Sequence, residues 1–184
     1  MATQTLKIGS LLPDFNLKGT DEKFYSPSLY RDKKILVVIF SCNHCPYVQA
    51  YEDRMKDLQK DFGSKGIQIL AINSNEESGY PEDSFENMKI RAENKKFNFP
   101  YLRDEDQEIA QKFDATHTPE IFVFDANRKL AYHGKIDDNW KEPEKVTIRY
   151  LKDAITELLN GQEVSIPETF SIGCTIKWKH TSLS

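Results

Sequence analysis

A continuous run of β-branched and aromatic residues from Ile35 to Phe40 most constrains how this chain can fold. Such a run predicts a strand that is buried on both faces, as in the parallel sheets of α/β proteins. The apolar period then changes to steps of three and four residues, which predicts a helix from Tyr47 to Phe62 that Gly63 ends. The segment between this strand and this helix contains two cysteines, Cys42 and Cys45.

Strand-like and helix-like patterns continue along the chain. We expect an N-terminal β-hairpin over residues 8–26, a strand over 67–72, helices over 84–96 and 106–113, a hairpin over 120–135, and a last helix that opens after Pro143 and closes at Gly161. Asp83 with Glu86, and Asp104 with Gln107, are the expected helix caps. Strands separated by helices imply parallel pairing, and the late hairpin adds an antiparallel edge. The prediction is a three-layer α/β fold with a mixed central sheet flanked by helices.

The length of 184 residues, without a repeat or a Gly/Ser-rich linker, predicts one domain over residues 1–184. Its core should span about residues 8–160. Residues 162–184 have no helical period, yet they contain apolar side chains that would not be stable in solvent: Ile166, Phe170, Ile172, Ile176 and Trp178. We therefore expect an ordered C-terminal tail that packs back across the domain.

Composition limits the environment and the partners. Binding to the phosphate backbone of a nucleic acid needs an excess of basic residues, and the formal charge of this chain is −4. We therefore expect no nucleic-acid partner. The longest apolar run, six residues, is far short of the about 20 that a membrane span needs. The N-terminus lacks a secretory pattern, and three cysteines make no disulfide framework. A cytoplasmic protein without a membrane partner is the expectation.

The chemistry is carried by the Cys42-Asn43-His44-Cys45 motif, which opens the helix after residue 46. Free N–H groups and the partial positive charge of a helix N-terminus favour a thiolate, the reactive form of cysteine. A protonated His44 would add a full positive charge. The two-residue spacing lets the second sulfur resolve a mixed disulfide formed by the first.

Zinc is the alternative use of paired cysteines. Four further residues could complete such a site: Cys174, His44, His117 and His180. No second CxxC and no HxxxH spacing is present, so we expect no metal.

Three segments together resemble a known superfamily. FSCNHCPYV at 40–48 resembles thioredoxin-superfamily active sites, and IGSLLPDFNL at 8–17 with HTPEIFVFD at 117–125 resembles the redoxin branch, which is peroxiredoxin-like or AhpC/TSA-like. With GCTIKW at 173–178, the chain is similar to small CxxC-containing thioredoxin-like proteins. The resemblance covers about residues 8–160. It implies a thioredoxin fold with an added N-terminal hairpin, and a cis Pro119 facing the cysteines.

The resemblance also separates two branches of this superfamily. Peroxiredoxins carry a Pro-x-x-x-Thr-x-x-Cys loop, and in that alignment Cys42 stands in place of the Thr and Val38 in place of the Pro. Thr118 and Pro119 stand where the peroxide-polarising arginine belongs. Two peroxidase elements are therefore missing, which favours thiol–disulfide exchange over peroxide reduction.

The residue roles follow from this resemblance. Cys42, expected to be the more exposed and lower-pKa thiol, attacks the substrate disulfide, and Cys45 resolves the mixed disulfide. The other expected site residues are His44 for tuning, Asn43, Thr118 and Pro119 for substrate binding, Glu120 as a candidate proton relay, and Cys174 as a candidate third redox thiol or, alternatively, buried structure. Glu120 and His44 are considered because the strand before the motif has no acid.

The expected function is a cytosolic thiol–disulfide oxidoreductase. Its substrate would be a protein or small-molecule disulfide, and an external thiol would be its electron donor. The enzyme would need no cofactor. One alternative is a peroxidase in which Cys45 becomes a sulfenic acid and Cys42 or Cys174 resolves it. The other is a non-enzymatic binding module whose surface changes with the state of the disulfide.

Overall fold

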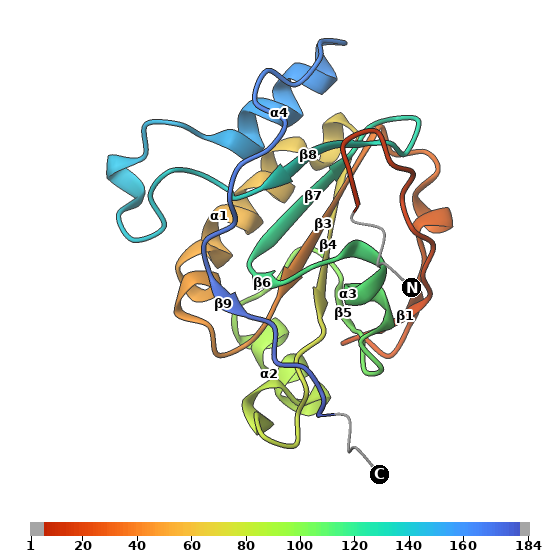
Figure 1. Cartoon of the computed structure of the whole chain (residues 1–184), viewed down its shortest axis with the longest axis vertical. Coiled ribbons are helices and arrows are strands. Elements are labelled where there is room, and N and C mark those ends of the chain that lie inside the picture. The colour runs from red at the N-terminus through yellow and green to blue at the C-terminus, as the bar shows by residue number, and fades with distance from the viewer. Residues whose placement is uncertain (1–5, 181–184) are drawn as a thin grey trace.

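The computed structural model describes residues 6–180, and a seven-stranded mixed sheet forms its centre (Figure 1). The strand order is β2-β1-β5-β4-β3-β7-β8. The strands are β1 (Leu17–Gly19), β2 (Phe24–Tyr25), β3 (Ile35–Ser41), β4 (Ile67–Asn73), β5 (Tyr101–Arg103), β7 (Glu120–Phe124) and β8 (Leu130–Gly134). β3 pairs in parallel with β4 and antiparallel with β7, so the expected mixed sheet, the N-terminal hairpin and the antiparallel edge are confirmed. β5 was not predicted, because only three residues form it.

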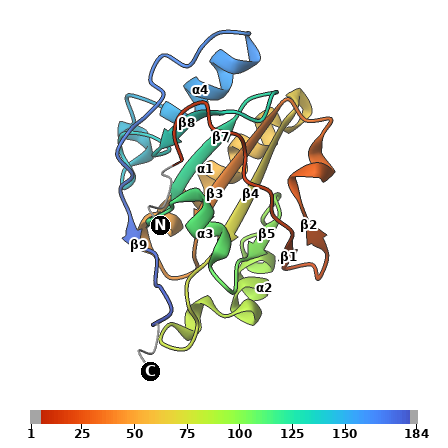
Figure 2. The same ribbon diagram turned by 45° about the vertical axis from the view of Figure 1, so that its right-hand side comes forward.

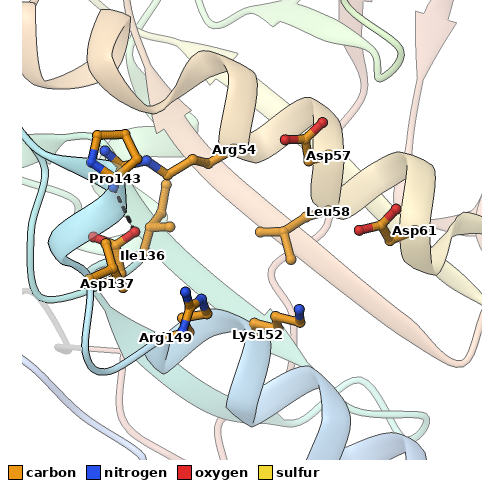
Figure 3. A pocket seen from close by; sticks show the side chains of 10 residues that line it. Arg54, Asp57, Leu58, Asp61, Ile136, Asp137, Pro143, Arg149 and Lys152 are labelled. Carbon is orange, nitrogen blue, oxygen red and sulfur yellow. Dashed lines mark hydrogen bonds and ion pairs between the residues drawn. The ribbon is translucent and has the colours of Figure 1, made fainter.

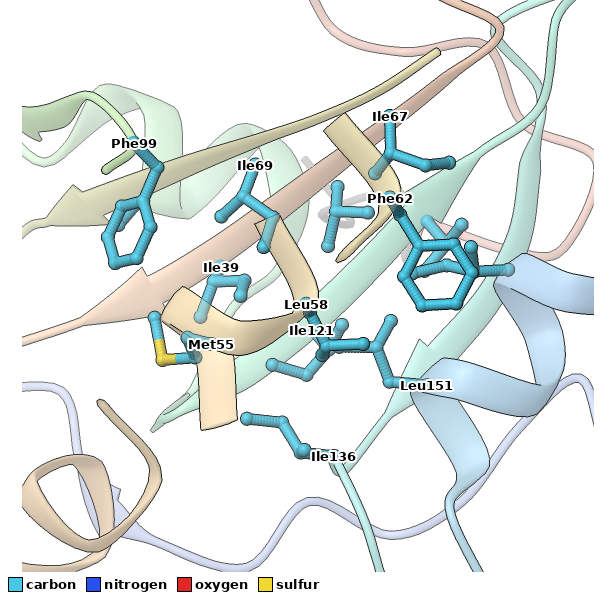
Figure 4. Close-up of a cluster of buried hydrophobic side chains, with 14 of the residues drawn as sticks. Ile39, Met55, Leu58, Phe62, Ile67, Ile69, Phe99, Ile121, Ile136 and Leu151 are labelled. Carbon is cyan, nitrogen blue, oxygen red and sulfur yellow. The ribbon is translucent and has the colours of Figure 1, made fainter. Parts of the chain in front are cut away.

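Helices cover both faces of the sheet. They are α1 (Pro46–Phe62), α2 (Phe85–Asn94), α3 (Glu108–Phe113) and α4 (Tyr150–Leu159), with 3-10 turns at Pro27–Tyr30, Gly63–Lys65, Pro81–Asp83 and Pro143–Lys145. Alternate side chains of β3 point to opposite faces: Ile39 packs with α1 and α4, whereas Phe40 packs with α3. Figure 4 shows the first core, where Met55 and Leu151 meet the sheet. Full burial of each such side chain stabilises the fold by about 1.5–3 kcal/mol.

The predicted end of the first helix is confirmed, because α1 runs to Phe62 with Gly63 as its C-cap residue. A 3-10 turn follows and ends at Gly66, which has a left-handed φ of 98°. Two other predicted helix ends were wrong. Pro143 opens only a 3-10 turn, and α4 begins at Tyr150. Ser84, not Asp83, caps α2, because its hydroxyl accepts the N–H of Asn87.

The predicted pair of Asp104 and Gln107 is confirmed only for Asp104, because Gln107 is the N-cap residue of α3 and its side chain makes no capping bond. The Asp104 carboxylate accepts the N–H groups of Ile109 and Ala110 at the start of α3. Because Ser84 caps α2, the carboxylate of Asp83 is available for the contacts described below.

The C-terminal tail packs back across the domain, as expected (Figure 2). It runs from α4 past β8 to β9 (Cys174–Thr175), which pairs antiparallel with β6 (His117–Thr118). Ile176 is buried, but Phe170 is 93% exposed, so only part of the tail is covered. No helix within residues 6–180 combines the length and the apolar character that crossing a membrane requires.

Candidate active site

Cys42 and Cys45 lie where β3 passes into α1. Cys42 directly follows β3, and Cys45 is the N-cap residue of α1, with Pro46 at the first helical position. Both side chains are buried, at 1% and 0% exposure. The expectation that Cys42 is the exposed thiol is therefore wrong. The two cysteines pack with Val48, and Cys174 of the tail lies against them, half-buried.

Thr118 lies against both sulfurs. The register of β3 with β7 sets Glu120 opposite Phe40, so the residues after β3 meet the residues before β7. Thr118 Oγ1 lies 3.4 Å from Cys42 Sγ, and the Thr118 carbonyl oxygen lies 3.3 Å from Cys45 Sγ. The Thr118–Pro119 peptide bond is cis, as the resemblance implies.

The two thiols differ in how readily they ionise. The hydrogen bond from the Cys42 thiol, helped by the Cys174 thiol and the N–H of Val48 and opposed by burial, lowers the pKa of Cys45 to about 4. The same hydrogen bond raises the pKa of Cys42, and burial and the carboxylate of Asp83 add to the rise. These contacts favour the thiolate on Cys45, and the carboxylate of Asp83 opposes negative charge on Cys42. Burial raises the pKa of Cys174 to about 11.

His44 pairs with a carboxylate that the sequence interpretation assigned to a helix cap. Its Nδ1 lies against Oδ2 of the fully buried Asp83, and its ring stacks on Tyr80 with the planes 9° apart. A ring nitrogen of His44, a carboxylate oxygen of Asp83 and Cys42 Sγ all lie within 4.8 Å of one another. Asp83 could have been found from topology, because it ends the loop after β4, and the carboxyl ends of the parallel strands β3 and β4 meet at one edge.

Asn43 holds the motif in place. Its backbone N–H donates to Asp83 over 2.6 Å, its side-chain NH2 donates to the Glu82 carbonyl oxygen, and its Oδ1 accepts the hydroxyl of Tyr101 over 2.7 Å. These contacts, in a side chain 6% exposed, give Asn43 a structural task instead of the substrate contact expected.

Glu120 holds the segment that contains Thr118. One carboxylate oxygen accepts the N–H groups of Thr116 and His117, and the other pairs with Nε2 of His133 over 2.7 Å. Within residues 6–180, no hydrogen bond of this carboxylate reaches a cysteine. Glu120 is thus a positioning residue, and the expected relay role does not follow from its contacts.

Cys42, His44 and Asp83 form the one group in residues 6–180 whose side chains are close enough to hold a metal ion together. The carboxylate of Asp83 already accepts from Asn43, Asn73 and Asn75 and pairs with His44. Because these partners occupy both carboxylate oxygens, the group as built is a hydrogen-bonded network around Asp83. His117, a further zinc candidate, contacts Thr116 through its Nδ1.

A separate hollow of about 260 Å³ lies between α1 and α4 (Figure 3). Arg54 reaches across it to Asp137 over 2.7 Å, and Asp57, Arg149 and Lys152 also line it. Charges of both signs line this hollow and no thiol does, so the candidate active site is the cysteine cluster.

Comparison with known proteins gives a family and a fold that agree with each other. Residues 8–133 match the model of the AhpC/TSA family. A crystal structure of an uncharacterized conserved protein from Geobacillus kaustophilus is 38% identical with a TM-score of 0.91, over 97% of this chain and 95% of that one. Solved thioredoxin domains share the architecture at lower identity, which confirms the expected thioredoxin fold.

Two curated relatives are more distant. A protein of Haemophilus influenzae provisionally named peroxiredoxin bcp is 27% identical over 108 residues, which are 59% of this chain and 64% of its own length. Thiol-disulfide oxidoreductase ResA of Geobacillus thermodenitrificans is 26% identical over 125 residues, 67% of this chain and 66% of its own length. The chain thus spans just under two thirds of the length of these two relatives.

Proposed function

The chain belongs to the AhpC/TSA family, and from this premise we propose that it catalyses thiol–disulfide exchange through Cys42 and Cys45. Its relatives make it a thiol-based oxidoreductase at the general level. The observation that carries the specific proposal is the pair of buried thiols at the start of α1, both in contact with Thr118. A cysteine pair with one stabilised thiolate and one protonated partner is ready for two-electron exchange.

In the proposed reaction the Cys45 thiolate attacks a substrate disulfide. A Cys45–substrate disulfide forms, and the first substrate sulfur leaves as a thiolate. Cys42 then loses its proton and attacks the Cys45 sulfur, which releases the second substrate thiolate and leaves a Cys42–Cys45 disulfide. The substrate gains the two electrons that the dithiol loses. An external thiol donor returns them, and no cofactor takes part.

The proton of Cys42 has a nearby acceptor. His44 and Asp83 both lie within 4.8 Å of the Cys42 sulfur. Asp83 holds the His44 ring in place, and a neutral imidazole can accept the thiol proton when Cys42 attacks. In this proposal His44 takes a proton from Cys42, whereas the sequence interpretation had it tuning the thiolate and, with Glu120, serving as a candidate proton relay for Cys45.

Cys42 as the first attacker is the competing order, implied by the resemblance to thioredoxins. It requires the thiolate on Cys42, where the Asp83 carboxylate opposes negative charge. Iodoacetamide labelling of reduced protein at roughly pH 6, below the ordinary thiol pKa, separates the two orders. We expect alkylation to favour Cys45, and preferential alkylation of Cys42 would restore the competing order.

Peroxide reduction is the second candidate, favoured by the low pKa of Cys45. The Cys45 thiolate would take an oxygen from a hydroperoxide to give a sulfenic acid and an alcohol. Cys42 would then condense with it, releasing water and forming the disulfide. The hydrogen-bond donors that favour the Cys45 thiolate are thiols and backbone N–H groups, and no arginine is among them. A peroxide oxygen would therefore lack a polarising cation.

Insulin-disulfide reduction and hydrogen peroxide consumption should be measured side by side on the wild type, Cys42→Ser and Cys45→Ser, with dithiothreitol as donor. We expect insulin reduction that both substitutions abolish, and peroxide consumption that is slow in comparison. Rapid peroxide consumption without insulin reduction would establish the peroxidase instead. If the protein shows neither activity but its Cys42–Cys45 disulfide forms reversibly, the result would favour the redox-regulated binding module.

A further inference from the structure

The tail occupies the strand edge beside the active site. Cys174 pairs with Thr118 and Thr175 with His117, in an antiparallel register immediately before Pro119. An extended chain on this edge has its central residue opposite Thr118, which contacts both reactive sulfurs. The residue in that place now is a cysteine, and its side chain packs against the cluster that Cys42 and Cys45 form.

This strand closes the site. Cys42 and Cys45 are 1% and 0% exposed, whereas Cys174 is half-buried. The backbone approaches very closely at Gly173, where an added Cβ would lie 2.1 Å from the carbonyl oxygen of Thr118. A substrate disulfide cannot reach the thiolate while residues 173–175 are in place.

The covering span is weakly held between two anchors. On one side Thr169 is bonded to Tyr132 and Lys135, and on the other Lys177 is bonded to Asn75. Between the anchors Phe170 is 93% and Ile172 is 46% exposed. Ser171 Oγ is buried without a hydrogen-bond partner among the described residues. Exposed apolar side chains and an unpaired polar atom are features of a segment that opens locally, and here they lie before Gly173. Beyond Cys174 the segment is held by the buried side chain of Ile176 and by its N–H, which donates to the Thr116 carbonyl oxygen.

We propose that residues 172–176 are an internal substitute for the substrate, and that an extended polypeptide carrying a disulfide binds to His117–Thr118 in their place. The inference rests on the function proposed above and specifies its substrate class. Displacement of the tail opens the site, and the incoming strand places its sulfur where the Cys174 sulfur lies, against Cys45. Exchange then proceeds with the same electron balance as before, and Cys174 remains a thiol.

The tail also predicts the neighbours of the substrate cysteine. In a strand, residues two apart share a face, so Ile172 and Ile176 face the domain with Cys174. Ile172 lines a small cavity with Pro119 and Trp140, and Ile176 is 3% exposed in the core that contains Phe113. The geometry therefore favours a substrate segment of the form apolar-x-Cys-x-apolar, with a small residue before the cysteine.

Gly173→Ala tests the occupancy, because its Cβ would collide with Thr118 and lift the strand. Phe170→Ala is the matched control in the same tail, at a side chain that is 93% exposed. The readout is the rate of alkylation of Cys42 and Cys45 in reduced protein, with thermal melting to show that each variant is folded. The alkylation rate is proportional to the fraction of molecules in which the tail is displaced. We therefore expect Gly173→Ala to raise the rate about tenfold and Phe170→Ala to leave it unchanged. An unchanged rate in folded Gly173→Ala would overturn the proposal.

Substrate choice supplies the second test. Two peptides with one intramolecular disulfide each are compared, one with isoleucine two residues to either side of a cysteine and one with glutamate there. We expect a KM about tenfold lower for the apolar peptide, since an apolar pocket discriminates against an unsuitable side chain by at least that order. Equal KM values would overturn the proposed register.

Cys174→Ser separates a substitute substrate from an electron relay. The serine keeps the strand pairing and removes a thiol that packs against Cys45, so peptide-disulfide reduction should fall by less than tenfold while the Cys42–Cys45 disulfide still forms. A tenfold loss in this variant would make Cys174 an obligatory redox partner and overturn the proposal. Failure of the underlying function is distinguishable: no variant would then reduce any disulfide, even where alkylation shows that the thiols are open.

Discussion

The backbone N–H of Asn43 donates a 2.6 Å hydrogen bond to Oδ1 of Asp83, forty residues further along the chain. This hydrogen bond ties the loop between the two cysteines to the loop after β4. The side-chain amides of Asn73 and Asn75 donate to the same carboxylate, over 3.1 and 3.0 Å. A fully buried carboxylate with this many donors fixes the conformation of the motif and places a negative charge beside Cys42.

Asp83→Asn should destabilise the reduced protein and change the thiol pair. The new NH2 group would face N–H donors, so we expect the free energy of unfolding to fall by about 1–3 kcal/mol. Loss of the negative charge should also lower the pKa of Cys42. Urea unfolding and pH-dependent alkylation measure the two effects. Glu82→Gln, at the exposed neighbouring side chain, is the control and should change neither.

The ionisation of Cys45 can be titrated directly. With a pKa of about 4, it should remain a thiolate from neutral pH down to about pH 4 and protonate below that. Because its folded pKa lies below the unfolded one, this thiolate contributes stability that is fully present above the unfolded thiol pKa of roughly 8.5 and is lost progressively as the pH falls to about 4. Ultraviolet thiolate absorbance of reduced protein measures the titration, and Cys45→Ser should abolish it.

Cys42→Ala extends this prediction. It removes the hydrogen bond that lowers the pKa of Cys45 most, so the absorbance should disappear at a higher pH than in the wild type. An unchanged midpoint would contradict a proton shared between the two sulfurs.

Local sequence patterns predicted most of the fold. The run Ile35 to Phe40 forms a strand buried on both faces, and the apolar period from Val48 forms α1. Helix ends were harder to predict. Gly63 begins a 3-10 turn that continues from α1, and Pro143 begins a 3-10 turn that precedes α4 without starting it. β5 was missed because its partners, β1 and β4, are distant in the sequence. Whether the chain is one domain over its whole length remains a prediction.

The motif identified the reactive cysteines, but their environment depends on contacts between distant segments. A helix N-terminus is local, and it suggested a thiolate in this turn. Which sulfur carries the charge depends on Asp83 and Cys174, which the fold brings from 41 residues beyond Cys42 and from the C-terminal tail. Asp83 precedes α2 and therefore looked like a cap. No local pattern could have shown that β6 and β9 pair.

Glu120→Gln should separate a positioning role from proton transfer. The amide retains an acceptor for the N–H groups of Thr116 and His117 but loses the charge paired with His133. Removing charge from a buried pair should lower the free energy of unfolding by about 1–3 kcal/mol. The pH dependence of insulin reduction should keep its midpoint, and Glu168→Gln, at an exposed acid, is the control for stability. A shifted midpoint would show that Glu120 takes part in proton transfer.

Removal of Cys42 should redirect the oxidised site to the tail. In Cys42→Ser treated with one equivalent of hydrogen peroxide, Cys45 becomes a sulfenic acid that its normal partner can no longer reduce. Cys174 packs against the cluster that contains Cys45, so the two should condense with loss of water to a Cys45–Cys174 disulfide. Non-reducing peptide mapping detects this bond, and Cys42→Ser with Cys174→Ser is the matched control. Sulfinic acid at Cys45 with a free Cys174 would contradict the prediction, because it would mean that the two sulfurs cannot reach disulfide geometry, which requires Cα atoms within about 7 Å.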